Sequence, residues 1–294
     1  CLVGSEMCIR DRTKSGKSGK TNVSYSGSAR FSDAIGIPDI MDSYTFAQYF
    51  NRASANKGGG DIFAPAVMER IKAYQEGTLK ATTVDNGAGI WQKWANANGN
   101  TDWFEEFYDH WAPSQEHNLS INGGTDKTQY LISGSFLDQK GLMRHGSDKF
   151  QRYTLNGKIT TAVTDWFKVT YSTKWTREDF ERPTYLTGSF FHNLARKWPV
   201  HPAYDPNGFP MDEGEVEQME NGGKQNSQKD FYTNQLQLVF EPIKNWKINL
   251  DGSVRTTTQY QHWEVLPVYA YNVDGDPYYT VWDMGYGSYA AGSS

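Results

Sequence analysis

The six histidines are the residues best suited to hold a metal ion or to move a proton, and they are scattered along the chain. None of them has HExxH spacing or another spacing typical of metal ligands. The GxSxG turn that presents a nucleophilic serine is also absent. The glycine clusters at residues 57–60 and 123–124 are not followed by the GK[ST] of a phosphate loop. The sequence thus offers no pattern for catalysis, for a metal site or for a cofactor.

Carboxylates stand close together at three places. The run DGD at residues 274–276 resembles the start of a calcium-binding loop. The further ligands of such a loop do not follow, so we expect a plain turn there. The adjacent acids Glu105 and Glu106, and likewise Asp212 and Glu213, are interpreted as solvent-exposed faces of their segments.

Aromatic residues in the second half of the chain are the best candidates for binding. Flat aromatic faces beside polar groups suit sugar rings and peptide side chains, and recognition residues usually lie on loops. Loops that pack on each other or on a partner protein would have the same composition. The candidate substrate-binding residues are Trp198, Tyr204, Trp263, Tyr269, Tyr271, Tyr278, Tyr279 and Trp282.

The composition suits half-exposed strands better than helices. Aromatic residues make up 15% of the chain, hydrophobic residues only 37%, and the mean hydropathy is -0.71. No apolar run approaches the roughly 18 residues of a membrane-spanning helix. The net charge of -5 and the lack of a basic stripe disfavour a nucleic-acid partner. Cys1 and Cys8 are the two cysteines, so no disulfide is expected in the rest of the chain.

Period-two alternation of apolar and polar side chains is the dominant pattern from Thr21 onward. Such alternation places one set of side chains on each face of a strand. It predicts about seven strands, at residues 23–31, 119–121, 130–136, 152–163, 167–176, 232–240 and 246–260.

The connections between these strands alternate between tight and long. Tight turns are expected at residues 124–128, 164–165 and 242–245. Long loops are expected at residues 32–116, 138–149 and 179–230, and after about residue 261. Loops beyond about 12–15 residues are uncommon in a compact domain. Here they occur only at alternate connections, so all of them leave the same end of the sheet, as the extracellular loops of outer-membrane barrels do.

The alternation alone does not reveal what the apolar face contacts, because a soluble sandwich shows the same pattern with that face inward. The loop asymmetry favours an antiparallel transmembrane β-barrel segment. Polar positions in two strands carry Arg152, Lys158, Lys168 and Lys174, charges that hydrocarbon would not accept. We therefore predict that the face with Asn156 and Ser172 looks into the barrel lumen.

Short helices are expected within the first long loop. The three helices are residues 44–52 capped by Ser43, a helix opened by Pro65 and ended by Gly77, and residues 102–111 capped by Thr101. Aromatic side chains line one side of the first and the third helix. We interpret these stripes as packing against neighbouring segments rather than as a ligand site.

Several stretches resemble the SusC/RagA-like family of TonB-dependent outer-membrane transporters. Residues 13–31, TKSGKSGKTNVSYSGSARF, are similar to that family's exit from the plug domain into the first barrel strand. Residues 42–51, DSYTFAQYFN, are similar to its helix after that strand. The longest similarity is TDWFEEFYDHWAPSQEHNLSINGGTDKTQYLISGSFLDQKGL at residues 101–142, followed by RYTLNGKITTAVTDWFKV at residues 152–169.

The resemblance implies a plugged barrel of about 22 strands in the cell outer membrane. It implies nutrient import energised by a TonB-type coupling protein, acting through an upstream region not included in these residues. It also implies a SusD-like surface lipoprotein as lid and oligosaccharide or peptide as cargo. The expected domains are residues 13–20 as the end of the plug and residues 21–294 as the first part of the barrel.

Two further expectations complete this interpretation. Residues 1–12, CLVGSEMCIRDR, resemble translated sequencing-adapter read-through and are excluded from the fold. The competing class is a soluble, secreted all-β module that binds glycans, or a glycan-active enzyme with aromatic-rich loops. Two sheets packed face to face would favour that class.

Overall fold

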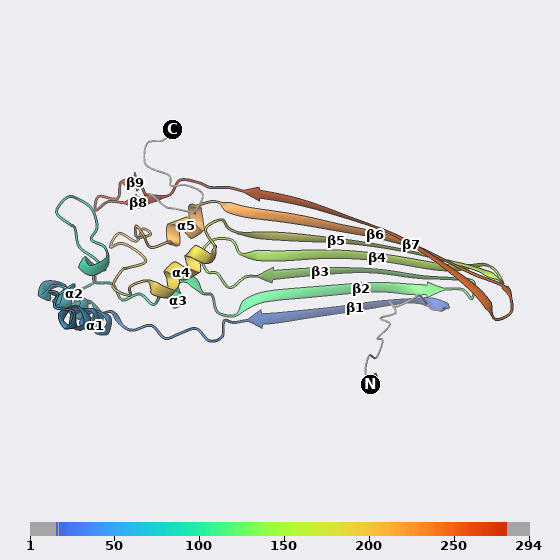
Figure 1. Cartoon of the computed structure of the whole chain (residues 1–294), viewed down its shortest axis with the longest axis horizontal. Coiled ribbons are helices and arrows are strands. Elements are labelled where there is room, and N and C mark those ends of the chain that lie inside the picture. The colour runs from blue at the N-terminus through green and yellow to red at the C-terminus, as the bar shows by residue number, and fades with distance from the viewer. Residues whose placement is uncertain (1–15, 17, 281–294) are drawn as a thin grey trace.

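A computed structural model describes residue 16 and residues 18–280 of the chain. Seven long strands in this part form one antiparallel sheet, and each strand pairs with its neighbours in sequence order (Figure 1). The strands are β1 (Gly19–Ser32), β2 (Ala112–Gly124), β3 (Thr128–Lys140), β4 (Lys149–Thr164), β5 (Phe167–Pro183), β6 (Lys224–Ile243) and β7 (Trp246–Trp263). All seven expected strands are confirmed. The sheet is not closed, because β1 and β7 form its two edges.

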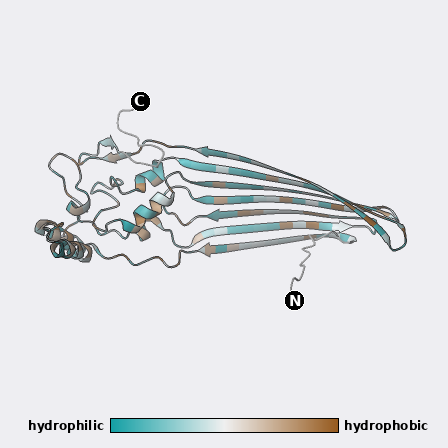
Figure 2. Ribbon diagram, in the orientation of Figure 1, coloured by the Kyte–Doolittle hydropathy of each residue, from teal (hydrophilic) through white to brown (hydrophobic). Residues whose placement is uncertain are grey.

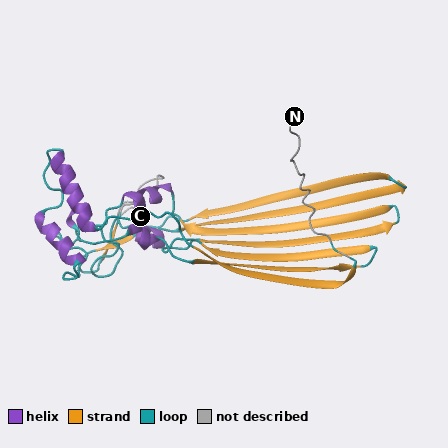
Figure 3. Ribbon diagram, turned by 90° about the horizontal axis from the view of Figure 1, so that it is seen from below, coloured by secondary structure: helices purple, strands orange, loops and turns teal. Residues whose placement is uncertain are grey.

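The connections separate by length to opposite ends of the sheet, as expected. Residues 125–127, 165–166 and 244–245 form tight turns at one end, whereas residues 33–111, 141–148 and 184–223 form the long connections at the other (Figures 1 and 3). The third long loop is shorter than predicted. This loop was expected at residues 179–230, but residues 179–183 and 224–230 continue the β5–β6 ladder, in which Arg182 pairs with Gln225.

The tight turn between β6 and β7 depends on a residue with a left-handed backbone. Asn245 has a φ of 72°, and the carboxylate of Glu241 accepts a hydrogen bond of 3.1 Å from its backbone N–H. Asparagine tolerates this conformation better than other residues with a side chain. This turn therefore stays tight although the β6–β7 register shifts between Phe240 and Ile243.

The two faces of the sheet differ in chemistry along its whole width. The registers align Tyr25 with Leu119, Leu155 with Trp175, and Tyr171 with Leu236 on one face. Directly opposed residues of antiparallel strands share a face, so one side is apolar from β1 to β7. Hydropathy accordingly alternates along each ribbon (Figure 2). The expected assignment of residues to the two faces agrees with these registers.

The long loops carry short helices at one end of the molecule (Figure 3). They are α1 (Ser43–Asn56), α2 (Pro65–Gln75), η1 (Trp94–Asn96), α3 (Trp103–Phe107), α4 (Gly188–Arg196) and α5 (Val216–Asn221). Among the described residues, no helix has the length and the apolar composition needed to cross a membrane. The sequence predicted α1, α2 and α3, but not η1, α4 and α5.

The predicted caps of α1 and α3 are wrong by one residue. Asp42 caps α1 by accepting a hydrogen bond from the backbone N–H of Thr45, whereas Ser43 is buried and donates to the carbonyl of Gly99. Asp102, not Thr101, caps α3. A carboxylate satisfies free N–H groups in a first turn at least as well as a hydroxyl does. Hydrogen bonding to Thr45 and Gln75 lowers the pKa of Asp42 to about 2.

Helix α3 also ends earlier than predicted, at Phe107 rather than at residue 111. Trp111 has a φ of 59° and an exposed side chain, so it leaves the aromatic stripe. Trp103 and Phe107 are fully buried, which confirms the packing role predicted for those two residues.

Two hydrophobic cores lie within the loop region. One joins α3, α4 and α5 through Trp103, Phe107, Phe190, Leu194, Val216 and Met219. The other joins α1 and α2 through Ala47, Phe63, Val67, Ile71 and Val200. A small hairpin, β8 (Tyr269–Tyr271) and β9 (Pro277–Tyr279), lies beside them. The DGD run is the plain turn of this hairpin, where Asn272 accepts hydrogen bonds from the backbone N–H groups of Asp274 and Asp276.

Candidate functional site

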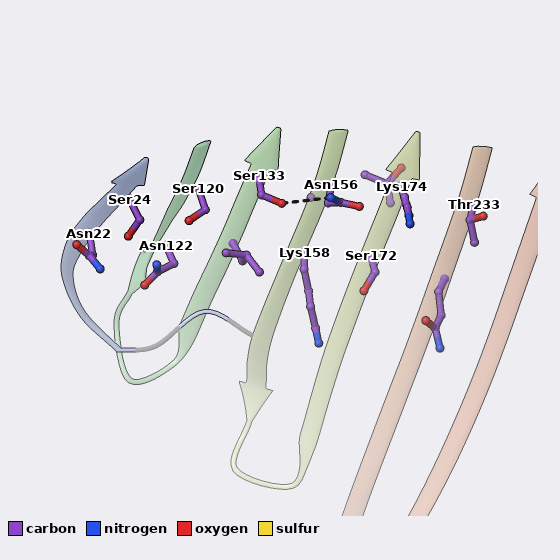
Figure 4. Close-up of a pocket in the computed structure, with 14 residues that line it drawn as sticks. Asn22, Ser24, Ser120, Asn122, Ser133, Asn156, Lys158, Ser172, Lys174 and Thr233 are labelled. Atoms are coloured by element: carbon purple, nitrogen blue, oxygen red, sulfur yellow. Dashed lines mark hydrogen bonds between the residues drawn. The ribbon is translucent and has the colours of Figure 1, made fainter. Parts of the chain in front are cut away.

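The polar face of the sheet forms an open hollow of about 1000 Å³ (Figure 4). Six strands contribute small or amide side chains together with two lysines. The residues around it are Asn22, Ser24, Ser120, Asn122, Leu131, Ser133, Asn156, Gly157, Lys158, Ser172, Thr173, Lys174, Thr233 and Gln235. Asn156 and Ser172, which the sequence assigned to the lumen side, both line this hollow.

Hydrogen bonds across neighbouring strands orient part of this face. The amide of Asn156 donates to Ser133 Oγ at 3.2 Å, as Figure 4 shows, and the hydroxyls of Thr160 and Thr170 lie 3.1 Å apart. Asn22 and Ser24, at the β1 side of the hollow, are exposed. The surface can therefore hold water or a polar ligand, and its small side chains leave room for one.

The charge of the hollow is positive. Lys158 and Lys174 are its charged residues, and the set of residues that lines it includes no Asp or Glu. Among the described residues, no group of three or more His, Cys, Asp or Glu side chains could hold a metal ion. The arrangement suits binding of polar or anionic groups.

The opposite face carries an apolar band with aromatic residues at both ends. On β5 this band extends from Phe167 to Trp175, eight residue steps or roughly 26 Å along the strand. The rings of Phe167 and Phe240 stack 4.5 Å apart at the turn end, and those of Phe136 and Tyr153 lie 5.0 Å apart toward the loops.

Charges appear on this face only beyond the aromatic residues at the loop end. Arg177 donates two hydrogen bonds of 2.9 Å to the carboxylate of Asp230, and the indole N–H of Trp175 donates to the same carboxylate. This ion pair therefore marks the end of the apolar band on β5 and β6.

The structure does not gather the eight candidate aromatic residues into one site. Trp198 packs within the α1–α2 core against Phe46, Phe50 and Phe63. Trp263 ends β7 and is exposed. Tyr204 is half-buried at the other core. Burial and a hydrogen bond to Glu106 raise its pKa to about 12.

The other candidates belong to the β8–β9 hairpin or lie outside the described residues. The rings of Tyr269 and Tyr279 lie 4.6 Å apart across this hairpin, and the ring of Tyr271 stacks on Phe209 at 4.1 Å. Tyr278 is half-buried. Trp282 lies outside the described part of the chain. Of the described candidates, Trp263 and Tyr279 present the most exposed rings.

The interpretation of the adjacent acids as solvated faces is wrong for Asp212, whose side chain is 14% exposed, whereas Glu213 stays exposed. Lys93 Nζ donates to Asp212 at 2.6 Å and to Glu213 at 2.7 Å. Burial opposes the charge of Lys93, but these hydrogen bonds outweigh it, so the pKa of Lys93 is raised. The pair is separated from Lys93 by about 120 residues of sequence, so no local pattern could have revealed it.

A second lysine is buried beside this group. Lys197 lies 3.4 Å from Glu215 with both side chains almost fully buried, and its ammonium stands 4.9 Å from the centre of the Trp103 ring. Burial lowers the pKa of Lys197. Such contacts between charge, carboxylate and aromatic face offset the cost of removing the ammonium from water.

His201 completes this cluster as a neutral side chain. Its ring stacks on Trp94 at 4.6 Å, its Nε2 donates to the carbonyl of Asp212, and its Nδ1 accepts from the backbone N–H of Trp94. Complete burial and the nearby Lys197 hold its pKa well below the usual value. The cluster connects the first and the third long loops.

His145, in the second long loop, connects the first and the third long loops. The interpretation of Glu106 as solvated is therefore wrong. His145 lies 2.9 Å from Glu106 in α3 and 2.7 Å from Glu220 in α5. Burial of the ring lowers its pKa, but the two carboxylates outweigh burial and raise it overall. The second of the adjacent acids is thus part of a bridge between loops, whereas Glu105 contacts the exposed His110.

Comparisons with known proteins place this fold. No family model matches the chain. It is 27% identical over 143 residues to the TonB-dependent receptor SusC of Bacteroides thetaiotaomicron, which covers 48% of the chain and 11% of SusC. It is 33% identical over 70 residues to the TonB-dependent receptor P3 of Formosa agariphila, which covers 24% of the chain and 7% of that receptor.

Solved structures match over most of the chain. The RagAB peptide importer in its closed-closed state superposes with a TM-score of 0.65 at 17% identity, covering 87% of this chain and 30% of the solved one. A further structure of the RagAB peptide transporter gives 0.61 at 18% identity, covering 84% and 29%. The chain therefore spans under a third of the solved chains that it matches. In sequence and in fold the chain is therefore similar to part of a SusC/RagA-type TonB-dependent receptor.

Proposed function

We propose that this chain forms part of the barrel wall of an outer-membrane importer energised through a TonB-type protein. The observation that supports this best is the two-faced sheet, with an apolar band on one side and a polar hollow on the other. A sheet in a soluble protein would need a second layer over its apolar face. Here residues such as Val23, Leu155 and Leu250 are more than half exposed.

The band fits the hydrocarbon layer of an outer membrane. Barrels of this class carry an apolar belt about 25 Å tall between rings of aromatic side chains. Lipid does not tolerate open edges, so β1 and β7 would pair with further strands of a larger barrel. In this proposal residues 21–294 belong to the barrel, and residues 13–20 are the end of a plug.

Cargo and partners follow from the same proposal. The cargo is oligosaccharide or peptide, and RagAB, described as a peptide importer, supports the second. A SusD-like surface lipoprotein would cover the loop end as a lid, and the TonB-type coupling protein would act through a region outside these residues. Of the described candidate aromatics, Trp263 and Tyr279 present the most exposed rings to cargo.

Accessibility of inserted tags tests the topology without any cargo. Epitope tags at Gly60 and Gly208, both exposed and with open space around them, should bind antibody on intact cells that express the complete receptor. A tag at Asn245 in the tight β6–β7 turn should bind antibody only after the outer membrane is permeabilised. Recovery of the receptor in the soluble fraction, or labelling of the Asn245 tag alone, would refute the proposal.

A further inference from the structure

A series of cations follows the polar face from the loop end toward the turn end. The register aligns Lys174 of β5 with Thr233 of β6, and Thr233 with Arg255 of β7. Lys158 of β4 pairs with Ser172, two residues along β5 from Lys174. These three cations therefore share one face within two adjacent levels of the sheet. Figure 4 shows Lys158 and Lys174 on neighbouring strands beside the hollow.

The series continues beyond the hollow at both ends. Lys168 lies four residues from Ser172 on the same face of β5, toward the turns. Toward the loops, Arg152 of β4 and Lys229 of β6 both stand opposite Glu178. We call Arg152, Lys158, Lys168, Lys174, Lys229 and Arg255 the cation track.

Few carboxylates offset this charge. Glu116, Glu178 and Asp251 are the acids that the register places on the same face between the outermost cations, and Arg30 binds Glu116 at 3.1 Å. No described carboxylate lies within 4 Å of Lys168, Lys174 or Arg255, although Arg255 stands 5.2 Å from the Phe231 ring. A surface lined by one sign of charge concentrates ligands of the opposite sign, and pores that pass anions are lined by Arg and Lys.

The spacing of the cation track matches an extended peptide. Levels on one face of a strand repeat every two residues, about 6.6 Å, and the cations occupy multiples of that step. An extended peptide lying along the strands presents its own alternate side chains at the same interval. Acidic residues at every second position would therefore meet Lys174 and Lys158 in turn. The Asn, Ser and Thr side chains of the hollow could bond the peptide groups.

We propose that the cation track selects acidic peptides in extended conformation as the preferred cargo. This inference rests on the proposed function and narrows its substrate class. No bond is made or broken in this step. The charges lower the free energy of an anionic chain along the wall relative to a neutral chain of the same length.

The test compares two short labelled peptides that differ only in carrying Glu or Gln at alternate positions. Binding to the complete, detergent-solubilised receptor is measured by fluorescence anisotropy, and the ratio of the two Kd values is the readout. The wild type should prefer the Glu peptide. K158Q/K174Q should lower that preference about tenfold, because it weakens binding of the Glu peptide more than binding of the Gln peptide. Salt at about 1 M, where the Debye length is roughly 3 Å, should lower it in the wild type.

Matched variants separate charge from folding. K57Q/K80Q removes the same charge from exposed lysines of the loops and should keep the preference. K158R/K174R keeps the charge and should keep it as well. Heat-modifiable migration on gels confirms that each variant has assembled.

Three outcomes would overturn the inference. One is an undiminished Glu preference in K158Q/K174Q. Another is no preference in the wild type. The third is a charge preference for uronic-acid over neutral oligosaccharides with none between the peptides, which would assign the cation track to acidic glycans. All three leave the topology from the tag experiment intact, so failure of this inference is distinguishable from failure of the proposed function.

Discussion

The sheet and the loop region of this chain are stabilised in different ways. Among the described residues, Ala112 is the only buried hydrophobic residue in the seven long strands, whereas the loops contain both hydrophobic cores and the buried Lys197–Glu215 pair. The sheet is held by its backbone ladders and leaves both faces open. The buried interior of this chain therefore lies in the long loops, and the strands expose both of their faces.

This difference predicts opposite responses to the same kind of substitution. A truncated side chain should matter in the loops, where cavities form, and matter little on the sheet. A charge should matter on the apolar face of the sheet, where the surroundings are proposed to be lipid. Three measurements can break or sharpen this comparison.

The largest effect is expected in the loop region. Trp103→Ala removes a fully buried ring that contacts Phe107, Lys197 and His201, and whose N–H donates to the carbonyl of Trp198. We expect a loss of about 3–5 kcal/mol in the loop region. Limited proteolysis should then cut residues 184–223, while heat-modifiable migration of the barrel stays normal. Trp111→Ala, at an exposed ring, is the control and should change neither readout. Loss of the barrel together with the loops would show that the two regions are one cooperative unit.

The second effect concerns the two faces of one strand. Leu155→Arg places a charge on the apolar face of β4 and should cost roughly 2–4 kcal/mol if that face meets lipid. Thr154→Arg, one residue away on the polar face, should cost far less. Urea titration of the folded receptor in lipid vesicles measures both. Equal losses, or a larger loss for Thr154→Arg, would show that the apolar face packs against protein.

The smallest effect is a pH dependence confined to the loops. The pKa of His145 is raised between Glu106 and Glu220, so its contribution to stability is complete below its ordinary pKa of 6.5. That contribution is lost as the pH rises through the higher value in the folded state. Hydrogen exchange in α5, corrected for intrinsic rates, should therefore become several-fold faster toward pH 9. His145→Gln should remove this dependence, whereas exchange in β4 should not respond in either protein. Hydrogen exchange in α5 that does not depend on pH in the wild type would contradict a stabilising contact of His145 with Glu106 and Glu220.

The sequence was sufficient to predict those features that depend on neighbouring residues alone. The strands at residues 152–163 and 167–176 were predicted with their faces, because alternation depends only on neighbouring residues. Pro65 and Gly77 marked the start and the end region of α2 for the same reason, since each acts on its own backbone. The caps of α1 and α3 were assigned one residue too early or too late because Ser, Thr and Asp are all competent caps and stand side by side.

What the sequence determined by itself was the number of strands, their two faces and the end from which the long loops leave. Only the tertiary structure decided the environment of the loop residues. Lys93 forms a hydrogen bond with Asp212, and His145 forms hydrogen bonds with Glu106 and Glu220. These partners are far apart in the sequence. Whether such a charge is solvated or buried depends on which distant segment covers it, and no periodicity within a segment encodes that choice. The same reason separates Trp198, which became part of a core, from Trp263, which stayed exposed at the end of its strand.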